Sequence, residues 1–147
     1  LAATDCAAEL EGNWWGNDTI WRTCLDLNRA LLYADRDGVL RDTPQRRELS
    51  IADAVVAGQG NGPLAPEALP TGAILAAVNP VAGDWMAARV FGWDPEAIPL
   101  LAHFREAAKW PLFTGQMPDS PAWDRFPAAR PPQGWRGKVE RDREEER

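Results

Sequence analysis

Three glycines alternate with two amides in one short segment, over Gly58, Gln59, Gly60, Asn61 and Gly62. Glycines let backbone N–H groups approach an anion closely, and the amide side chains add hydrogen-bond donors and acceptors. The segment lacks the Gly-Lys-Ser/Thr sequence of a P-loop. It predicts a loop that binds a small polar or anionic molecule. A structural turn with glycines at positive φ is the alternative.

Two aspartates and one asparagine lie near this segment in the sequence. Asp53 falls in the apolar stretch before it, where a buried carboxylate is costly unless it is bonded or paired. Asp53 is therefore a hydrogen-bonded anchor, an edge-facing residue or an acid/base group. Asn79 ends the next apolar stretch, and Asp84 follows in the expected first helical turn, as a favourable helix-end charge or an acid/base group. Together with Asn61, these oxygen-bearing side chains could bind a divalent metal such as magnesium.

A second polar group marks the start of the first expected helix. Asn17 or Asp18 can accept the unpaired backbone N–H groups of the first turn, and Arg22 is spaced to pair with Asp18. Alternatively, Arg22 binds a carboxylate or phosphate of a ligand, with Asn17 and Asp18 beside it. His103 is the only histidine, so a catalytic triad or a multi-histidine zinc site has little to build on.

Composition excludes several classes of function. The 147 residues are enough for one domain with a core, and the net charge of -6 disfavours nucleic acid and anionic membrane as partners. No apolar run approaches the ~20 residues that span a bilayer. Two cysteines, Cys6 and Cys24, cannot hold an iron–sulfur cluster, and reduced thiols in a cytoplasmic protein are expected.

Apolar periodicity predicts the elements that would position these groups. Helices are expected over 18–34, 81–91 and 99–108, and buried strands over 49–57 and 73–78. This order predicts a single layered α/β domain whose sheet is incomplete. Because ligands of such sheets sit beyond the carboxyl ends of strands, the glycine segment, Asn79 and Asp84 are expected to share a crevice.

The first helix is expected to turn one apolar face towards the core. That face consists of Ile20, Cys24, Leu27, Leu31 and Ala34, and it is widened by Trp21, Leu25 and Leu32.

The C-terminal part differs in character. Six prolines fall within 111–132, and tryptophans alternate with them, so neither a regular helix nor a central strand is expected. We predict a domain over 1–109, an extended Pro/Trp-rich arm over 110–137 that lays its aromatics on the domain, and a charged flexible tail over 138–147.

Several of these stretches together resemble an uncharacterised family, domain of unknown function 362. The matching stretches are 16–22, 25–29, Asp53, 57–64, Asn79-Pro80, Asp84, 91–95, 98–99 and 134–137. Family members are generally longer towards the N-terminus, and Gln59 stands where the family's loop carries Glu. The resemblance implies no settled activity, but it favours the same site.

Three hypotheses follow from the sequence. The first is an enzyme, or part of one, in which Asp53 or Asp84 acts as acid/base or metal ligand and Asn61 orients a small ligand. The second is a non-catalytic binding or assembly module, with the aromatic arm as an interface or a site of self-association. The third is an inactive fragment of a longer protein.

Overall fold

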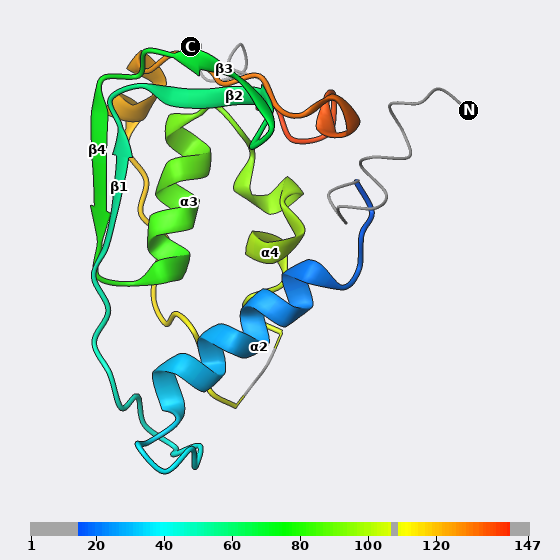
Figure 1. Cartoon of the computed structure of the whole chain (residues 1–147). Coiled ribbons are helices and arrows are strands. Elements are labelled where there is room, and N and C mark those ends of the chain that lie inside the picture. Colours follow the sequence, from blue (N-terminus) through cyan, green and yellow to red (C-terminus); the bar gives the residue numbers. More distant parts are fainter. Residues whose placement is uncertain (1–14, 107–108, 142–147) are drawn as a thin grey trace.

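The computed structural model describes residues 15–106 and 109–141 as a mixed α/β fold with two small antiparallel sheets (Figure 1). Its helices and strands are α2 (Ile20–Tyr33), β1 (Ser50–Ala54), β2 (Ala57–Asn61), β3 (Ala65–Leu69), β4 (Ala73–Ala77), α3 (Pro80–Val90) and α4 (Pro99–Ala102). Short 3-10 turns follow at η1 (Pro95–Ala97), η2 (Pro121–Arg125) and η3 (Gln133–Trp135). The α/β class expected from the sequence is confirmed.

The four strands form one bent antiparallel ribbon. β1 pairs with β4 from Ser50↔Ala77 to Ala54↔Ala73, and β2 pairs with β3 from Ala57↔Leu69 to Asn61↔Ala65. Short connections join the two pairs at the bend, where Gly72 N donates to Val55 O at 2.9 Å. Gly72 has a φ of +67°, which glycine adopts without steric cost.

Two of the four strands, β2 and β3, were not predicted from the sequence. The expected strand over 49–57 breaks after Ala54, and the glycine segment is not a loop but forms β2 and the turn after it. β3 contains Pro66, which argues against a strand in the interior of a sheet but is tolerated here because a two-stranded ribbon has only edges.

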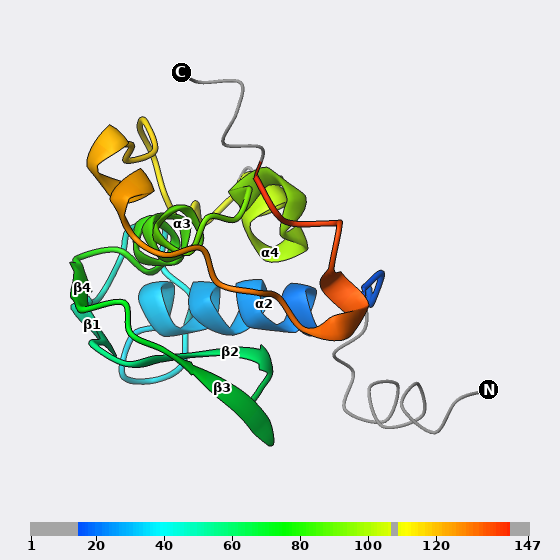
Figure 2. The same cartoon turned by 90° about the horizontal axis from the view of Figure 1, so that it is seen from above.

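The two faces of the β1–β4 ribbon carry side chains of different size. The inner face is built mainly of small residues, and Gly83 of α3 packs so closely on Ala77 that a Cβ at position 83 would lie 3.1 Å from the Ala77 Cβ. The outer face carries the large aliphatic side chains, and neither view of the described residues places a segment over it (Figures 1 and 2). The prediction that the strands over 49–57 and 73–78 are buried is therefore wrong for their outer face.

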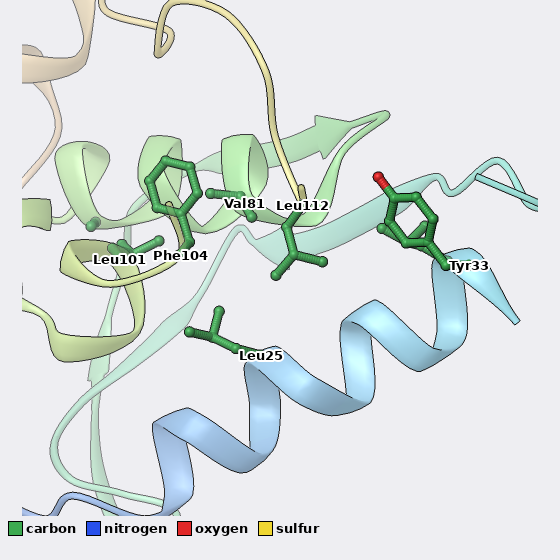
Figure 3. Close-up of a cluster of buried hydrophobic side chains, with 8 residues drawn as sticks. Leu25, Tyr33, Val81, Leu101, Phe104 and Leu112 are labelled. Atoms are coloured by element: carbon green, nitrogen blue, oxygen red, sulfur yellow. The ribbon is translucent and has the colours of Figure 1, made fainter. Parts of the chain in front are cut away.

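The core lies between the helices and the start of the arm (Figure 3). It consists of Leu25, Leu32, Tyr33, Val81, Ala88, Leu101, Phe104 and Leu112. α2 enters it through Leu25, Leu32 and Tyr33, whereas Ile20, Leu27 and Leu31 of the predicted core face are 47–64% exposed. The expected helix is present, but it contacts the core through one edge of its predicted apolar face rather than through the centre of that face.

α4 is shorter than predicted. It ends at Ala102, with His103 as its C-cap, rather than continuing to 108. His103 leaves the helix to stack on Trp21 of α2, with ring centroids 4.6 Å apart, and its Nδ1 bonds the Glu106 carboxylate. Residues 107 and 108 lie outside the described part of the chain.

The arm returns across the domain from η2 to η3 (Figure 2). Trp93 Nε1 donates to Ala129 O at 2.8 Å, and Tyr33 Oη donates to Pro111 O at 2.7 Å. Leu112 and Ala129 of the arm are buried, and so is Val139, which falls within the range expected to be a flexible tail. The N-terminal segment 1–14 and the end of the expected tail, 142–147, lie outside the described residues.

Candidate functional site

The two amides of the glycine segment bind the arm. Gln59 Oε1 accepts from Arg130 N, and Asn61 Oδ1 accepts from Gln133 N, both at 3.0 Å. Gly60 N donates to Arg130 O at 2.8 Å. The sequence predicts that these side-chain amides and backbone N–H groups bind a ligand. In the structure they form hydrogen bonds with the backbone of the arm instead.

The glycines of this segment allow close approach between parts of the chain. A Cβ at Gly58 would lie 3.1 Å from the Pro66 Cβ, and Gly60 has a φ of +76° with the Arg130 guanidinium beside it. Gly62 leads into the turn through a cis peptide bond to Pro63. Gly60 has the positive φ of the structural alternative, but it lies in a strand rather than a turn, and neither Gly58 nor Gly62 has a positive φ.

Arg130 also fixes the arm to the neighbouring strand. Its guanidinium forms an ion pair with Glu67 of β3. The hydrogen bond and the positive charge of Arg130 hold the pKa of the Glu67 carboxyl below its ordinary value. The ribbon tip and the arm are thus joined by both backbone and side-chain contacts.

Asp53 and Asn79 also have local partners. Asp53 is exposed, and its Oδ1 accepts from Val55 N at 2.9 Å, which anchors the bend between β1 and β2. Asn79 caps α3 by accepting from Ala82 N at 3.1 Å, and its Nδ2 donates to Leu112 O at 2.8 Å. Asp53 thus has one of the structural roles stated for it above, whereas the capping role of Asn79 was not among the expectations.

Asp84 is the one predicted acid whose ionisation is perturbed. It lies beyond the first turn of α3, so the predicted helix-end role does not apply. Part of its surface is open to solvent, yet the packing around it and the negative charge of Glu48 raise the pKa of its carboxyl. Within the described residues no set of three metal-ligating side chains forms around it or elsewhere.

The predicted crevice is not assembled. Asn61 lies at the tip of the ribbon, at the end of the β2–β3 register, whereas Asn79 follows the opposite end, beyond Ser50↔Ala77. Asp53 lies between these ends, on the outer face. Antiparallel pairing explains the difference, because it sends the C-termini of β1 and β4 to opposite ends of their sheet.

The polar residues at the start of α2, Asn17, Asp18 and Arg22, form hydrogen bonds to the first backbone N–H groups and one ion pair. Asn17 Oδ1 accepts from Thr19 N and Ile20 N, both at 3.0 Å, and Arg22 pairs with Asp18 at 3.1 Å. Arg22 also lines a small cleft of about 250 Å³ together with Trp21 and His103.

Sequence reasoning missed a larger cavity of about 660 Å³ between α3, α4 and the arm. Its lining includes Trp85, Arg89, Phe104, Arg105, Met117 and Asp119. These residues come from α3, from the residues after α4 and from the arm, all between positions 85 and 119. No single motif marks them, and only the return of the arm brings them together.

Sequence reasoning also missed the exposed outer face of the ribbon, although its signal is present in the residues. Along β1 and the residues beside it, the large aliphatics Leu49, Ile51 and Val55 occupy alternate positions, whereas in and after β4 only Ile74 and Val78 lie on the outer face and Leu75 lies on the inner one. That alternation identifies a face, but not whether the chain covers it.

Comparisons with protein-family models, with curated proteins and with solved structures found no match. The resemblance to domain of unknown function 362 stays a prediction from the residues. In the described part of the chain, no helix is long and apolar enough to cross a bilayer.

Proposed function

We propose that this chain is an assembly module that pairs with a second copy of itself through the outer face of the β1–β4 ribbon. The observation that carries the proposal is the arrangement of side-chain sizes on the two faces. Apart from Leu75, the residues on the face towards α3 are small, whereas five large aliphatics lie on the face towards solvent. Aliphatic side chains gathered on one exposed face are typical of an interaction surface.

The outer face is defined by strand alternation. Ile51 is opposite Ala76 and Asp53 is opposite Ile74, so these four residues share one face. The same alternation adds the flanking residues Leu49, Val55 and Val78. The exposed fractions of the large aliphatics are 65% for Leu49, 67% for Ile51, 49% for Val55, 68% for Ile74 and 81% for Val78.

The area of this face suits the core of a dimer interface. At about 60–100 Å² of apolar surface for each large aliphatic, its five side chains would bury about 400 Å² per copy. A stable interface of standard size buries about 800 Å² per partner, roughly half of it apolar. The polar residues around the face would supply the rim.

The charges along β1 favour a second copy as the partner. Arg47 and Asp53 flank Leu49 and Ile51, and Arg47 is exposed without an ion pair among the described residues. When two copies of this segment run antiparallel, Arg47 of each faces Asp53 of the other, and Leu49 faces Ile51. Such self-complementarity is what a two-fold interface requires.

A charge-reversal series tests the proposal. We expect the purified wild-type chain to be a dimer by light scattering at micromolar concentration. Arg47→Asp and Asp53→Arg should each weaken the dimer at least tenfold, because like charges then meet across the two-fold axis. The double variant Arg47→Asp/Asp53→Arg should restore it.

Leu64→Lys is the matched control, since Leu64 is 81% exposed but lies at the ribbon tip, away from the outer face. It should leave the dimer intact. A wild-type monomer at all concentrations would overturn the proposal, as would a dimer that the single reversals leave unchanged.

The arm, which first suggested an assembly role, is better explained as part of the fold. Trp110 Nε1 donates to Arg41 O at 3.0 Å, and Trp135 packs edge-on against Trp15. Trp93 receives the arm through Ala129. These tryptophans form their contacts within one chain. We therefore assign the partner surface to the outer face of the ribbon.

A further inference from the structure

The cavity between α3, α4 and the arm has the size of a metabolite site. Its volume of about 660 Å³ lies within the roughly 300–1,000 Å³ typical of ligand pockets. The cleft beside Trp21 is smaller, at about 250 Å³, and the two arginines that line it are paired with Asp18 and Asp26. The larger cavity is the stronger candidate.

One part of the cavity lining is apolar and aromatic. Leu101 and Phe104 are each 3% exposed, and half-buried Trp85 and Met117 complete this wall. Aromatic rings and a methionine thioether favour a flat apolar group. The side chain of an aromatic amino acid has that shape.

Two arginines in the lining supply positive charge. Arg89 pairs with Asp119 at 2.8 Å through Nη2, and its buried Nε has no partner among the described residues. Arg105 is exposed, its Nη2 donates to Gly115 O at 3.2 Å, and its guanidinium lies 4.8 Å from the Phe104 ring centroid. A guanidinium beside an aromatic wall is well placed to bind the carboxylate of a ligand whose ring packs on that wall.

Two carboxylates line the cavity from η1. Asp94 Oδ1 accepts from Glu96 N at 2.9 Å, and neither Asp94 nor Glu96 forms an ion pair among the described residues. These acids repel a ligand that is only an anion, and they attract an ammonium group. The lining thus combines an apolar wall with separate cationic and anionic groups.

We propose that this cavity binds a small zwitterion with an aromatic body, of the size of an aromatic dipeptide with free amino and carboxyl ends. The carboxylate is bound by Arg105, the ammonium group by Glu96 and Asp94, and the ring packs on the half-buried side chains of Trp85 and Met117. This site is independent of the outer face, so binding and dimer formation can be measured separately.

Three related probes test the proposal by titration calorimetry on the full chain. They are phenylalanyl-phenylalanine, its N-acetyl derivative and its C-terminal amide. Each derivative removes one of the two charges, and together they distinguish a free dipeptide from the C-terminus or the N-terminus of a longer peptide. We expect the free dipeptide to bind at least fivefold more tightly than either derivative.

Two variants and a control locate the site. Arg105→Met and Glu96→Gln affect exposed side chains, so the fold should survive, and each should weaken dipeptide binding at least fivefold. Arg22→Met removes an exposed arginine outside the cavity and should leave the affinity unchanged. Absence of dipeptide binding, equal affinity for all three probes, or unchanged affinity in both cavity variants would overturn the proposal.

Discussion

Amide side chains act in this molecule as connections between one segment of chain and another. Gln59 and Asn61 accept from the arm, and Asn79 both caps α3 and donates to Leu112 O. The sequence alone does not show whether such a residue binds a ligand or another part of the chain. An amide side chain donates and accepts hydrogen bonds equally well with either partner. Which partner it meets depends on segments far away in the sequence.

The cap of α2 allows a comparison between two neighbouring residues. Asn17→Ala removes the acceptor for two backbone N–H groups, so the free energy of unfolding should fall by about 1 kcal/mol. Asp18→Ala removes only an exposed pair with Arg22 and should cost less than about 0.5 kcal/mol. Urea denaturation measures both, and equal losses would contradict the assignment of the cap.

Asp84 predicts a pH dependence with a definite sign. Its carboxyl pKa is raised in the folded state, first by burial and then by Glu48, so the folded chain holds this proton more tightly than the unfolded chain. Ionisation of Asp84 therefore opposes folding. The free energy of unfolding falls as the pH rises from the ordinary aspartate pKa through the raised one.

Asp84→Asn should accordingly stabilise the fold near neutral pH, by less than about 1 kcal/mol once solvent screening is allowed for. The gain should shrink as the pH falls towards ~4. Thermal melts of both proteins across this pH range measure it. Glu48→Gln should reproduce part of the gain, and a benefit that grows towards low pH would contradict this account.

At the scale of elements, Gly60 is the position where the ribbon depends most on a glycine. Its φ of +76° is unfavourable for an L side chain, and an added Cβ would meet the Arg130 guanidinium at 3.6 Å. Gly60→Ala should therefore lower the free energy of unfolding by about 1–2 kcal/mol.

Gly134→Ala is the matched control, because Gly134 has no positive φ and an added Cβ there meets nothing within 4 Å. It should change stability by less than about 0.5 kcal/mol. Chemical denaturation compares the two variants, and equal effects would show that the strain at Gly60 is unimportant.

Apolar patterning identified α2, α3, β1 and β4 because apolar side chains recur through each of them. It did not identify β2 or β3, since glycines and Pro66 carry no apolar alternation. The face of α2 was misjudged for a related reason. Tyr33, Leu25 and Leu32 are held by the arm and α4, and the sequence of the helix alone does not contain those neighbours.

The candidate sites could be predicted only in part. Asn17 accepts from the first backbone N–H group of α2, as local spacing predicts, although the N-cap position itself is Thr19. The cavity near Arg89 and Arg105 could not be predicted, because its walls come from three segments joined only by tertiary packing. The proposed crevice at strand ends assumed parallel strands, and antiparallel pairing separated its members.

At the scale of the whole molecule, the arm is part of the domain. Leu112 belongs to the core, Val139 is 1% exposed, and Asp94 N donates to Val139 O at 2.7 Å. The sequence boundary at residue 109 marks a change in composition rather than an independent folding unit.

Removing residues 110–147 should therefore abolish cooperative thermal unfolding, because it exposes the face of the core that Leu112 covers. Removing only 142–147 leaves every described contact in place and should shift the melting temperature little. Calorimetry of both truncations measures this, and a cooperative transition in the shorter chain would contradict the integral role of the arm.

The hydrogen bonds that Arg130 N and Gln133 N donate to the side chains of β2 have a consequence for biosynthesis. A ribosome makes the ribbon first, and about fifty-five residues beyond Ala77 must be added before the peptide that caps its tip exists. Contacts this distant along the chain close slowly. Until they close, a nascent ribbon exposes unpaired backbone at its tip as well as its aliphatic face, so aggregation during translation should be most acute in this interval.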